Sequence, residues 1–167
     1  LEKEGVENYM ILIGGEVVVK GVNQNGVCWR TGINLPEDDP DGIKNNYDEI
    51  VQLCKKGAIA TSGNYRNFYI KDGKKYAHTI DPRTGYPAEQ SVLSATIVAN
   101  DCMTADAYAT AFMAMGLEKA RQMADSLPEI EYYVIYADEN GKHQIEYSKG
   151  MLQYLSLIHI SEPTRPR

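Results

Sequence analysis

Residues 92–116 read VLSATIVANDCMTADAYATAFMAMG, and the periodicity of this stretch changes halfway along it. Val92 to Ala99 is rich in β-branched residues and predicts a strand. Thr104 to Met115 instead carries Ala, Met, Tyr and Phe at helical spacing, and Gly116 is a typical residue directly after a helix. A strand followed closely by a helix predicts a fold that mixes the two elements.

The segments on either side of this stretch complete the predicted fold. A second helix is predicted over Glu118 to Ser126, and a hairpin across Asn140-Gly141 is predicted next. The short connections favour a largely antiparallel sheet packed against helices in one α+β domain, with the strands before the first helix forming a meander. The predicted strands other than Val92 to Ala99 are Tyr9 to Ile13, Glu16 to Val22, Val27 to Ile33, Tyr47 to Leu53, Gly57 to Thr61, Phe68 to Ile70, Tyr76 to Ile80, Glu131 to Ala137 and His143 to Tyr147.

Composition excludes several classes of protein. Of the 167 residues, 43% are hydrophobic and 24% charged, which is typical of one globular domain and not of a disordered, collagenous or coiled-coil chain. Lys and Arg number 17 against 23 Asp and Glu, so phosphate neutralisation does not favour a nucleic-acid partner. No apolar run approaches the roughly 18 residues of a membrane span, so no transmembrane span is expected in this chain.

Three cysteines, Cys28, Cys54 and Cys102, lie far apart without a Cys-x-x-Cys spacing. The pattern therefore indicates neither a disulfide framework nor a zinc site, and all three are predicted to be small core residues.

The end of the chain has an unusual sequence. Leu155 to Arg165 resembles the translation of a transposase sequencing adapter, so residues 155–167 are expected to be a non-native tail and residues 1–154 the domain. A natural polar tail is the alternative. On the adapter interpretation His159 is no candidate, which leaves His78 and His143.

Chemistry-bearing side chains gather in two segments, residues 60–66 and 76–87. They stand at predicted strand ends and in loops, where binding and catalytic residues are usually found. Strand alternation places His78 and Ile80 on one face and Thr79 on the other, so His78 and Ile80 could line one pocket. Each of these residues taken alone is explained equally well by a turn.

A second constellation lies on the predicted helix. Asp106 and Thr110 are four residues apart, so their oxygens lie one turn apart on the same face. A hard cation such as Mg²⁺ prefers oxygen ligands of this kind. The alternative is an Asp that opposes the helix dipole in the first turn and a Thr that hydrogen-bonds back to the helix.

In combination these motifs resemble the ApbE family of FAD:protein FMN transferases. The resemblance rests on Gly14-Gly15-Glu16-Val17, Trp29-Arg30-Thr31-Gly32-Ile33, Thr61-Ser62-Gly63-Asn64-Tyr65-Arg66, His78-Thr79-Ile80-Asp81-Pro82-Arg83-Thr84-Gly85 and Ala105-Asp106-Ala107-Tyr108-Ala109-Thr110. It implies an ApbE-like, T-fold-like α+β fold and a Mg²⁺-dependent enzyme. Such an enzyme moves FMN from FAD onto a Thr or Ser hydroxyl of a target protein and releases AMP.

The resemblance also implies roles for individual residues. Asp106 and Thr110 match the family's metal ligands, His78 matches its proposed general base, and Ile80 matches a residue that contacts the flavin. Ser62 and Gly63 lie in the motif that borders the nucleotide and are expected to bind the cofactor.

Family members are longer, so the chain is expected to be the carboxy-terminal portion of a transferase, truncated and inactive on its own. The family's targets are flavin-carrying subunits of membrane redox complexes. Its members lie outside the cytoplasm, in the periplasm or on the outer face of the membrane, often through a lipid anchor on the amino terminus. Two alternatives to flavin transfer are a Mg²⁺-dependent FAD pyrophosphatase, in which water replaces the target hydroxyl, and a flavin-binding module without catalysis.

Overall fold

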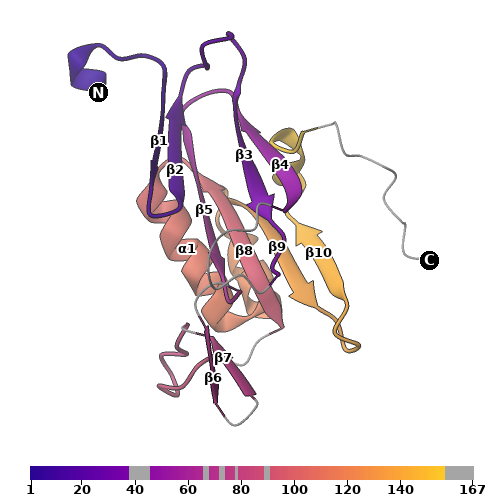
Figure 1. Cartoon of the computed structure of the whole chain (residues 1–167). Coiled ribbons are helices and arrows are strands. Elements are labelled where there is room, and N and C mark those ends of the chain that lie inside the picture. Colours follow the sequence, from indigo (N-terminus) through magenta and orange to yellow (C-terminus); the bar gives the residue numbers. More distant parts are fainter. Residues whose placement is uncertain (38–45, 66–67, 72–73, 78, 89–90, 157–167) are drawn as a thin grey trace.

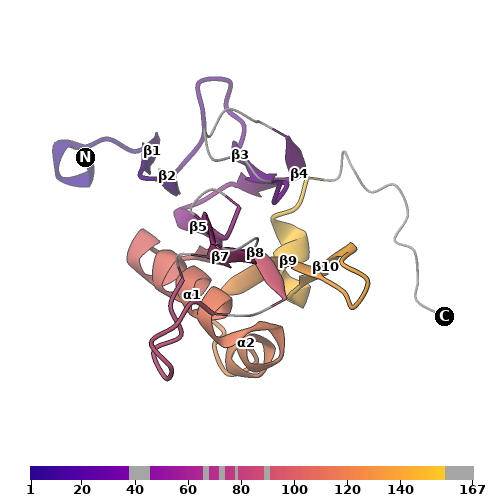
Figure 2. The ribbon, with the colours of Figure 1, turned by 60° about the horizontal axis from the view of Figure 1, so that its bottom comes forward.

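The computed structural model describes residues 1–37, 46–65, 68–71, 74–77, 79–88 and 91–156, with the backbone alone at 68–71 and 74–77. A six-stranded sheet forms the middle layer, two helices cover one face, and a two-stranded sheet covers the other (Figures 1 and 2). This arrangement confirms the predicted α+β class.

Every pairing in the six-stranded sheet is antiparallel, as predicted. Its strands, in spatial order, are β1 (Tyr9–Ile13), β2 (Glu16–Lys20), β5 (Gly57–Gly63), β8 (Val92–Ala99), β9 (Glu131–Ala137) and β10 (His143–Tyr147). The strand β8 is buried along almost its whole length. A strand buried on both faces needs apolar cover on each side of the sheet, which explains the three layers.

Two hairpins at the edges of this sheet follow local sequence. Gly14 and Gly15 both have positive φ, 70° and 116°, and connect β1 to β2 in a two-residue turn that only such backbone angles allow. The predicted β9–β10 hairpin also forms, with Gly141 at φ 76°.

The helices are α1 (Cys102–Met115) and α2 (Leu117–Ala124). The helix α1 begins two residues before the predicted start, because the Asp101 carboxylate accepts hydrogen bonds from the Thr104 N–H and Thr104 O–H, both at 2.9 Å. Its buried face packs on the sheet and forms the first core, whose members include Ala60, Ala95, Ile97, Ala105, Ala109, Phe112 and Met113.

The two-stranded sheet corrects the predicted meander. Its strands β3 (Trp29–Asn34) and β4 (Tyr47–Leu53) pair with each other, while β2 pairs with β5 across a long excursion of the chain. The strands β3 and β4 lie on the second face of the central sheet and are not part of it. They contribute Ile33, Val51 and Leu53 to a second core, which also contains Ile59 and Tyr133 of the central sheet. Burial of the second face thus replaces the pairing of β2 with β3 and of β4 with β5 that a meander would have.

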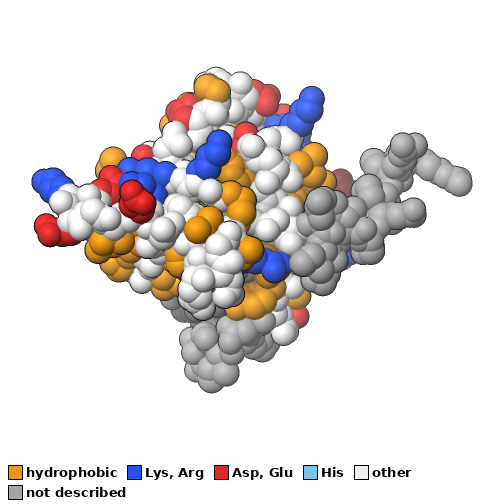
Figure 3. Space-filling model, turned by 90° about the horizontal axis from the view of Figure 1, so that it is seen from above, with side chains coloured by type: hydrophobic (Ala, Val, Ile, Leu, Met, Phe, Trp, Pro, Cys, Tyr) orange, Lys and Arg blue, Asp and Glu red, His pale blue; other side chains and the backbone are white. Residues whose placement is uncertain are grey.

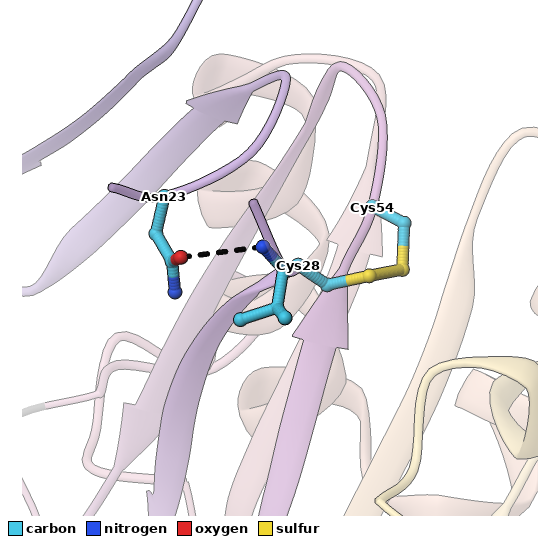
Figure 4. Close-up of a disulfide and its surroundings, with 4 residues drawn as sticks. Asn23, Cys28 and Cys54 are labelled. Atoms are coloured by element: carbon cyan, nitrogen blue, oxygen red, sulfur yellow. Dashed lines mark hydrogen bonds between the residues drawn. A yellow bond between two sulfur atoms is a disulfide. The ribbon is translucent and has the colours of Figure 1, made fainter. Parts of the chain in front are cut away.

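The prediction for Cys28 and Cys54 was wrong, because these residues form a disulfide (Figure 4). Trp29 pairs with Leu53 at the end of the β3–β4 ladder, and Cys28 and Cys54 are the residues just beyond this pair. The two cysteines therefore lie opposite each other, with Cα atoms 4.3 Å apart. The bond closes the open end of the β3–β4 ladder. Cys102 is free and half-buried, which partly matches its predicted core role.

A short hairpin of β6 (Phe68–Lys71) and β7 (Lys74–Ala77) extends from the end of the molecule at which β5 finishes (Figure 1). The remaining elements are the 3₁₀ helices η1 (Glu2–Glu4) and η2 (Lys149–Gln153). No helix in the described part of the chain is long and apolar enough to cross a membrane.

Beyond η2 the chain runs along β4. The Gln52 N–H donates to the Tyr154 carbonyl at 2.7 Å, the Ser156 N–H donates to the Ile50 carbonyl at 2.9 Å, and Leu155 bridges to Val51. Leu155 and Ser156 therefore pack as part of the fold. Residues 157–167 lie outside the described residues, and the non-native origin of 155–167 stays a prediction.

Candidate functional site

The structure brings two predicted site residues together from distant parts of the sequence. Ser62 is near the end of β5, and its Oγ lies 3.1 Å from the Oγ1 of Thr110 on α1, 48 residues later. Ala60 and Ser62 share the helix-facing side of β5, and Ala60 is in the first core beneath α1. Packing of the helix on the strand therefore fixes this contact.

Asp106 lies one turn before Thr110 on α1, and both residues are exposed. Because α1 begins at Cys102, Asp106 lies beyond its first turn, which contains no acidic residue. A favourable interaction with the helix dipole therefore does not explain the presence of Asp106. The side-chain partner of Thr110 is Ser62 on the neighbouring strand. The exposed helix face thus carries a carboxylate and a hydroxyl that the alternative interpretation of these residues does not explain.

Negative charge surrounds the first half of α1. Burial, followed by the charges of Glu16, Asp101 and Asp106, raises the pKa of the Cys102 thiol. These three acidic residues near the start of α1 favour a cation over an anion there.

Asp106 and Thr110 fit part of a site for a hard cation. They offer one carboxylate and one hydroxyl oxygen, and Mg²⁺ commonly takes its other ligands from water and from substrate phosphates. Among the described residues no cluster of three or more His, Cys, Asp or Glu side chains could hold a metal by itself.

The predicted loop around Ile80 is closed on itself. Ile80 bridges to Pro87, and the Asp81 N–H donates to the Tyr86 carbonyl at 2.9 Å. Thr79 is buried whereas Ile80 is 48% exposed, in agreement with the alternation expected from the sequence. Tyr86 is also exposed, so the loop presents two large apolar side chains at the surface.

Asp81 holds this loop together. Its carboxylate accepts two hydrogen bonds from the Arg83 guanidinium, at 2.9 and 2.6 Å, and one from the Arg83 N–H at 2.9 Å. The Arg83 hydrogen bonds lower the pKa of Asp81 to about 2. The Lys119 ammonium on α2 makes a smaller contribution to this lowering of the pKa.

His78, predicted to be the general base, lies outside the described residues, and its role stays a prediction. Its neighbours at Thr79 and Ile80 are described, but they give no position for the imidazole.

Gly63 follows Ser62 and has a packing explanation. A Cβ at this position would lie 2.3 Å from the Cε1 atom of the buried Tyr65 ring. The glycine therefore allows Tyr65 to fold back over the end of β5.

A cavity of about 440 Å³ lies at the opposite end of β5, beside Gly57, and is separate from Ser62. Figure 3 looks onto that end of the molecule, where Lys and Arg side chains stand among hydrophobic ones. Lys55, Lys56, Glu129 and Glu131 are among its lining residues, so its charges largely offset one another. It contains none of the predicted site residues.

Two residues that support the candidate site were not predicted from the sequence. Asp101 caps the helix that carries Asp106, and Arg83 clamps Asp81. An Asp directly before a helix is a usable capping signal. The Asp81–Arg83 pair has no comparable signal, because an i,i+2 spacing brings side chains together only in particular turns.

Comparison with known proteins agrees with this architecture. Residues 1–134 match the sequence model of the ApbE family. The FAD:protein FMN transferase of Vibrio cholerae is 44% identical over 141 residues, which cover 84% of this chain and 40% of that protein. The FAD:protein FMN transferase of Treponema pallidum is 30% identical over 166 residues, which cover 95% and 43% respectively.

Solved structures give the same result. The flavin transferase ApbE from Vibrio cholerae is similar with a TM-score of 0.77 at 39% identity, over 93% of this chain and 47% of that one. The ApbE protein from Thermotoga maritima is similar with a TM-score of 0.72 at 32% identity, over 88% and 44%. The chain belongs to the ApbE family, and it spans about two fifths of the length of the curated relatives it matches, 40% in the first case.

Proposed function

We propose that the complete protein transfers FMN from FAD to a Thr or Ser hydroxyl of a target protein and releases AMP. The observation that carries this proposal is the exposed face of α1, where Asp106 stands one turn from a Thr110 hydroxyl held by Ser62. The family relatives named FAD:protein FMN transferase support the same reaction.

In this reaction the target hydroxyl oxygen forms a bond to the FMN phosphorus, and the bond from that phosphorus to the AMP oxygen breaks. Asp106 and Thr110 would hold a Mg²⁺ ion, which when bound neutralises the negative charge of the diphosphate. His78 accepts the proton that the target hydroxyl loses. The reaction balances, because the new phosphoester bond replaces the bond to AMP and the proton of the hydroxyl goes to His78.

The other site residues place the dinucleotide. Ile80 is exposed and apolar, which suits contact with the flavin ring. Ser62 and Gly63 finish β5 beside α1. In this proposal they border the nucleotide. The protein substrates in this proposal are flavin-accepting subunits of membrane redox complexes.

The proposal places the protein outside the cytoplasm, in the periplasm or on the outer face of the membrane by a lipid anchor. The Cys28–Cys54 disulfide supports this location, because disulfides persist in oxidising compartments and are rare in the cytosol. Rapid alkylation of free thiols in intact cells tests it: only Cys102 of the three cysteines should be labelled before reduction. Labelling of all three would contradict an oxidising location.

One incubation separates flavin transfer from the two alternatives. The full-length protein is mixed with FAD and Mg²⁺, with or without a Thr-bearing target peptide, and the products are followed by chromatography and mass spectrometry. Covalent FMN on the peptide supports transfer, free FMN and AMP without peptide support a pyrophosphatase, and unchanged bound FAD supports a binding module.

The Asp106→Ala variant tests the role of the helix face in this reaction. We expect it to lose at least tenfold in rate, because one metal ligand is removed. The control is Asp125→Ala, which removes an exposed carboxylate from the end of α2. Equal rates for wild type and Asp106→Ala would contradict the proposed cation site.

A further inference from the structure

The contact between Ser62 and Thr110 joins two elements that are each held rigidly. Ser62 pairs with Ala95 across the interior β5–β8 ladder, and Thr110 follows Ala109, which is fully buried in the first core. The two hydroxyl oxygens are therefore 3.1 Å apart because of core packing. Neither side chain needs a loop to bring it into place.

A threonine in a helix has two accessible χ1 rotamers, because its hydroxyl can also donate to a backbone carbonyl three or four residues earlier. For Thr110 the backbone acceptor four residues earlier is the carbonyl of Asp106. The contact with Ser62 instead places the Thr110 oxygen within hydrogen-bonding distance of the strand, where either hydroxyl can be the donor. Ser62 thus sets the direction of the Thr110 oxygen.

The direction of the proton follows from the chemistry of a metal ligand. A neutral hydroxyl ligates a cation through a lone pair, so its proton must point to another acceptor. Ser62 Oγ is an acceptor at hydrogen-bonding distance from Thr110. Donation from Thr110 to Ser62 leaves the Thr110 lone pairs free on the exposed helix face that Asp106 shares.

We infer that Ser62 is a positioning residue, which orients the Thr110 hydroxyl for cation binding and acts on the cation only through Thr110. This inference rests on the proposed function, since it assumes the cation site on α1. Outer hydrogen-bond partners of metal ligands commonly change metal affinity by about 10- to 100-fold when removed. The loss of Ser62 therefore weakens cation binding while Asp106 and Thr110 are both still present.

Three variants of the full-length protein test the role of Ser62, with Mn²⁺ alone as the probe and electron paramagnetic resonance to measure its affinity. Ser62→Ala should weaken Mn²⁺ binding about tenfold. Ser62→Thr retains a hydroxyl on a half-exposed strand position and should restore most of the affinity. The matched control is Thr61→Ala, whose hydroxyl contacts Thr96 at 2.8 Å on the other face of β5, and it should leave the affinity within about twofold of wild type.

A second measurement reports the position of Thr110 without any cation. Scalar couplings of the Thr110 methyl group give its χ1 rotamer, and they should change in Ser62→Ala but not in Thr61→Ala. Unchanged couplings in Ser62→Ala, or an unchanged Mn²⁺ affinity, would overturn the positioning role.

Thr110→Ala separates failure of this inference from failure of the proposed function. Weaker Mn²⁺ binding in Thr110→Ala, with wild-type binding in Ser62→Ala, overturns the role of Ser62 and leaves the cation site standing. Wild-type binding in both variants overturns the cation site and the inference with it.

Discussion

Asp81 shows how a single side chain organises the loop that carries Ile80. Its carboxylate accepts hydrogen bonds from the Arg83 backbone and side chain, while its carbonyl accepts from the N–H groups of Thr84 and Gly85, at 3.2 and 2.8 Å. The hydrogen bonds from Arg83 therefore depend on the ionised Asp81 carboxylate, whereas those from Thr84 and Gly85 do not.

This dependence predicts a change in the loop with pH. The Asp81 pKa is lowered to about 2 in the folded protein, so the charged form favours the folded loop. Its contribution is complete above the ordinary aspartate pKa of about 4 and is lost as pH falls through about 2. Amide hydrogen exchange of Arg83, whose N–H donates to Asp81, should accelerate over this range relative to the intrinsic rate.

Asp81→Asn provides the control for this titration. The variant should show faster Arg83 exchange at pH 5 and no further local loss of protection down to pH 2. A pH dependence of Arg83 exchange equal to that of wild type would assign the effect to other carboxyl groups.

Gly63 supports a second prediction about a single residue. Gly63→Ala forces the new methyl group against the Tyr65 ring and should lower the free energy of unfolding by about 1–3 kcal/mol. Gly57→Ala is the matched control on the same strand, because its Cβ would lie 3.6 Å from Leu53, an ordinary contact. Urea denaturation of both variants measures the difference, and equal stabilities would show that Tyr65 moves aside without cost.

Elements differ in how far their partners could be predicted from sequence. The β9–β10 hairpin was predicted correctly because the turn at Asn140-Gly141 is local. The pairing of β2 with β5 was missed, because burial of the second sheet face decides it and no local signal records that face. The same reason hid the Ser62–Thr110 contact: each motif was recognised, but their contact depends on how α1 packs on the sheet.

The cap of α1 supports a prediction at the scale of the element. Asp101→Ala removes the acceptor of both Thr104 hydrogen bonds and should lower the free energy of unfolding by about 1 kcal/mol. Because the cap lies one turn before Asp106, amide exchange near the helix start should also increase. Asp125→Ala, at the end of α2, removes no side-chain cap and serves as the control. A loss in Asp125→Ala as large as in Asp101→Ala would argue that the charge, and not the cap, accounts for the effect.

At the scale of the whole molecule, the disulfide decides how firmly the second layer covers the sheet. The strands β3 and β4 bury Val19, Ile59, Tyr133 and Ile135 beneath them, and the connection between these strands is long. Cys28 and Cys54 are 26 residues apart in the sequence, and their disulfide joins β3 and β4 at the end of the ladder away from that connection. The cross-link restricts the unfolded chain, which raises the free energy of unfolding.

The double variant Cys28→Ser, Cys54→Ser should therefore have a free energy of unfolding about 3.5 kcal/mol lower than wild type, the loop-closure value for a separation of this size. Urea denaturation of oxidised and dithiothreitol-treated wild type should show the same difference, while the double variant should not respond to dithiothreitol. Cys102→Ser is the matched control, since it removes a thiol outside the disulfide. A double variant as stable as oxidised wild type would mean that packing of Ile33, Val51 and Leu53 on the second core alone holds the layer in place.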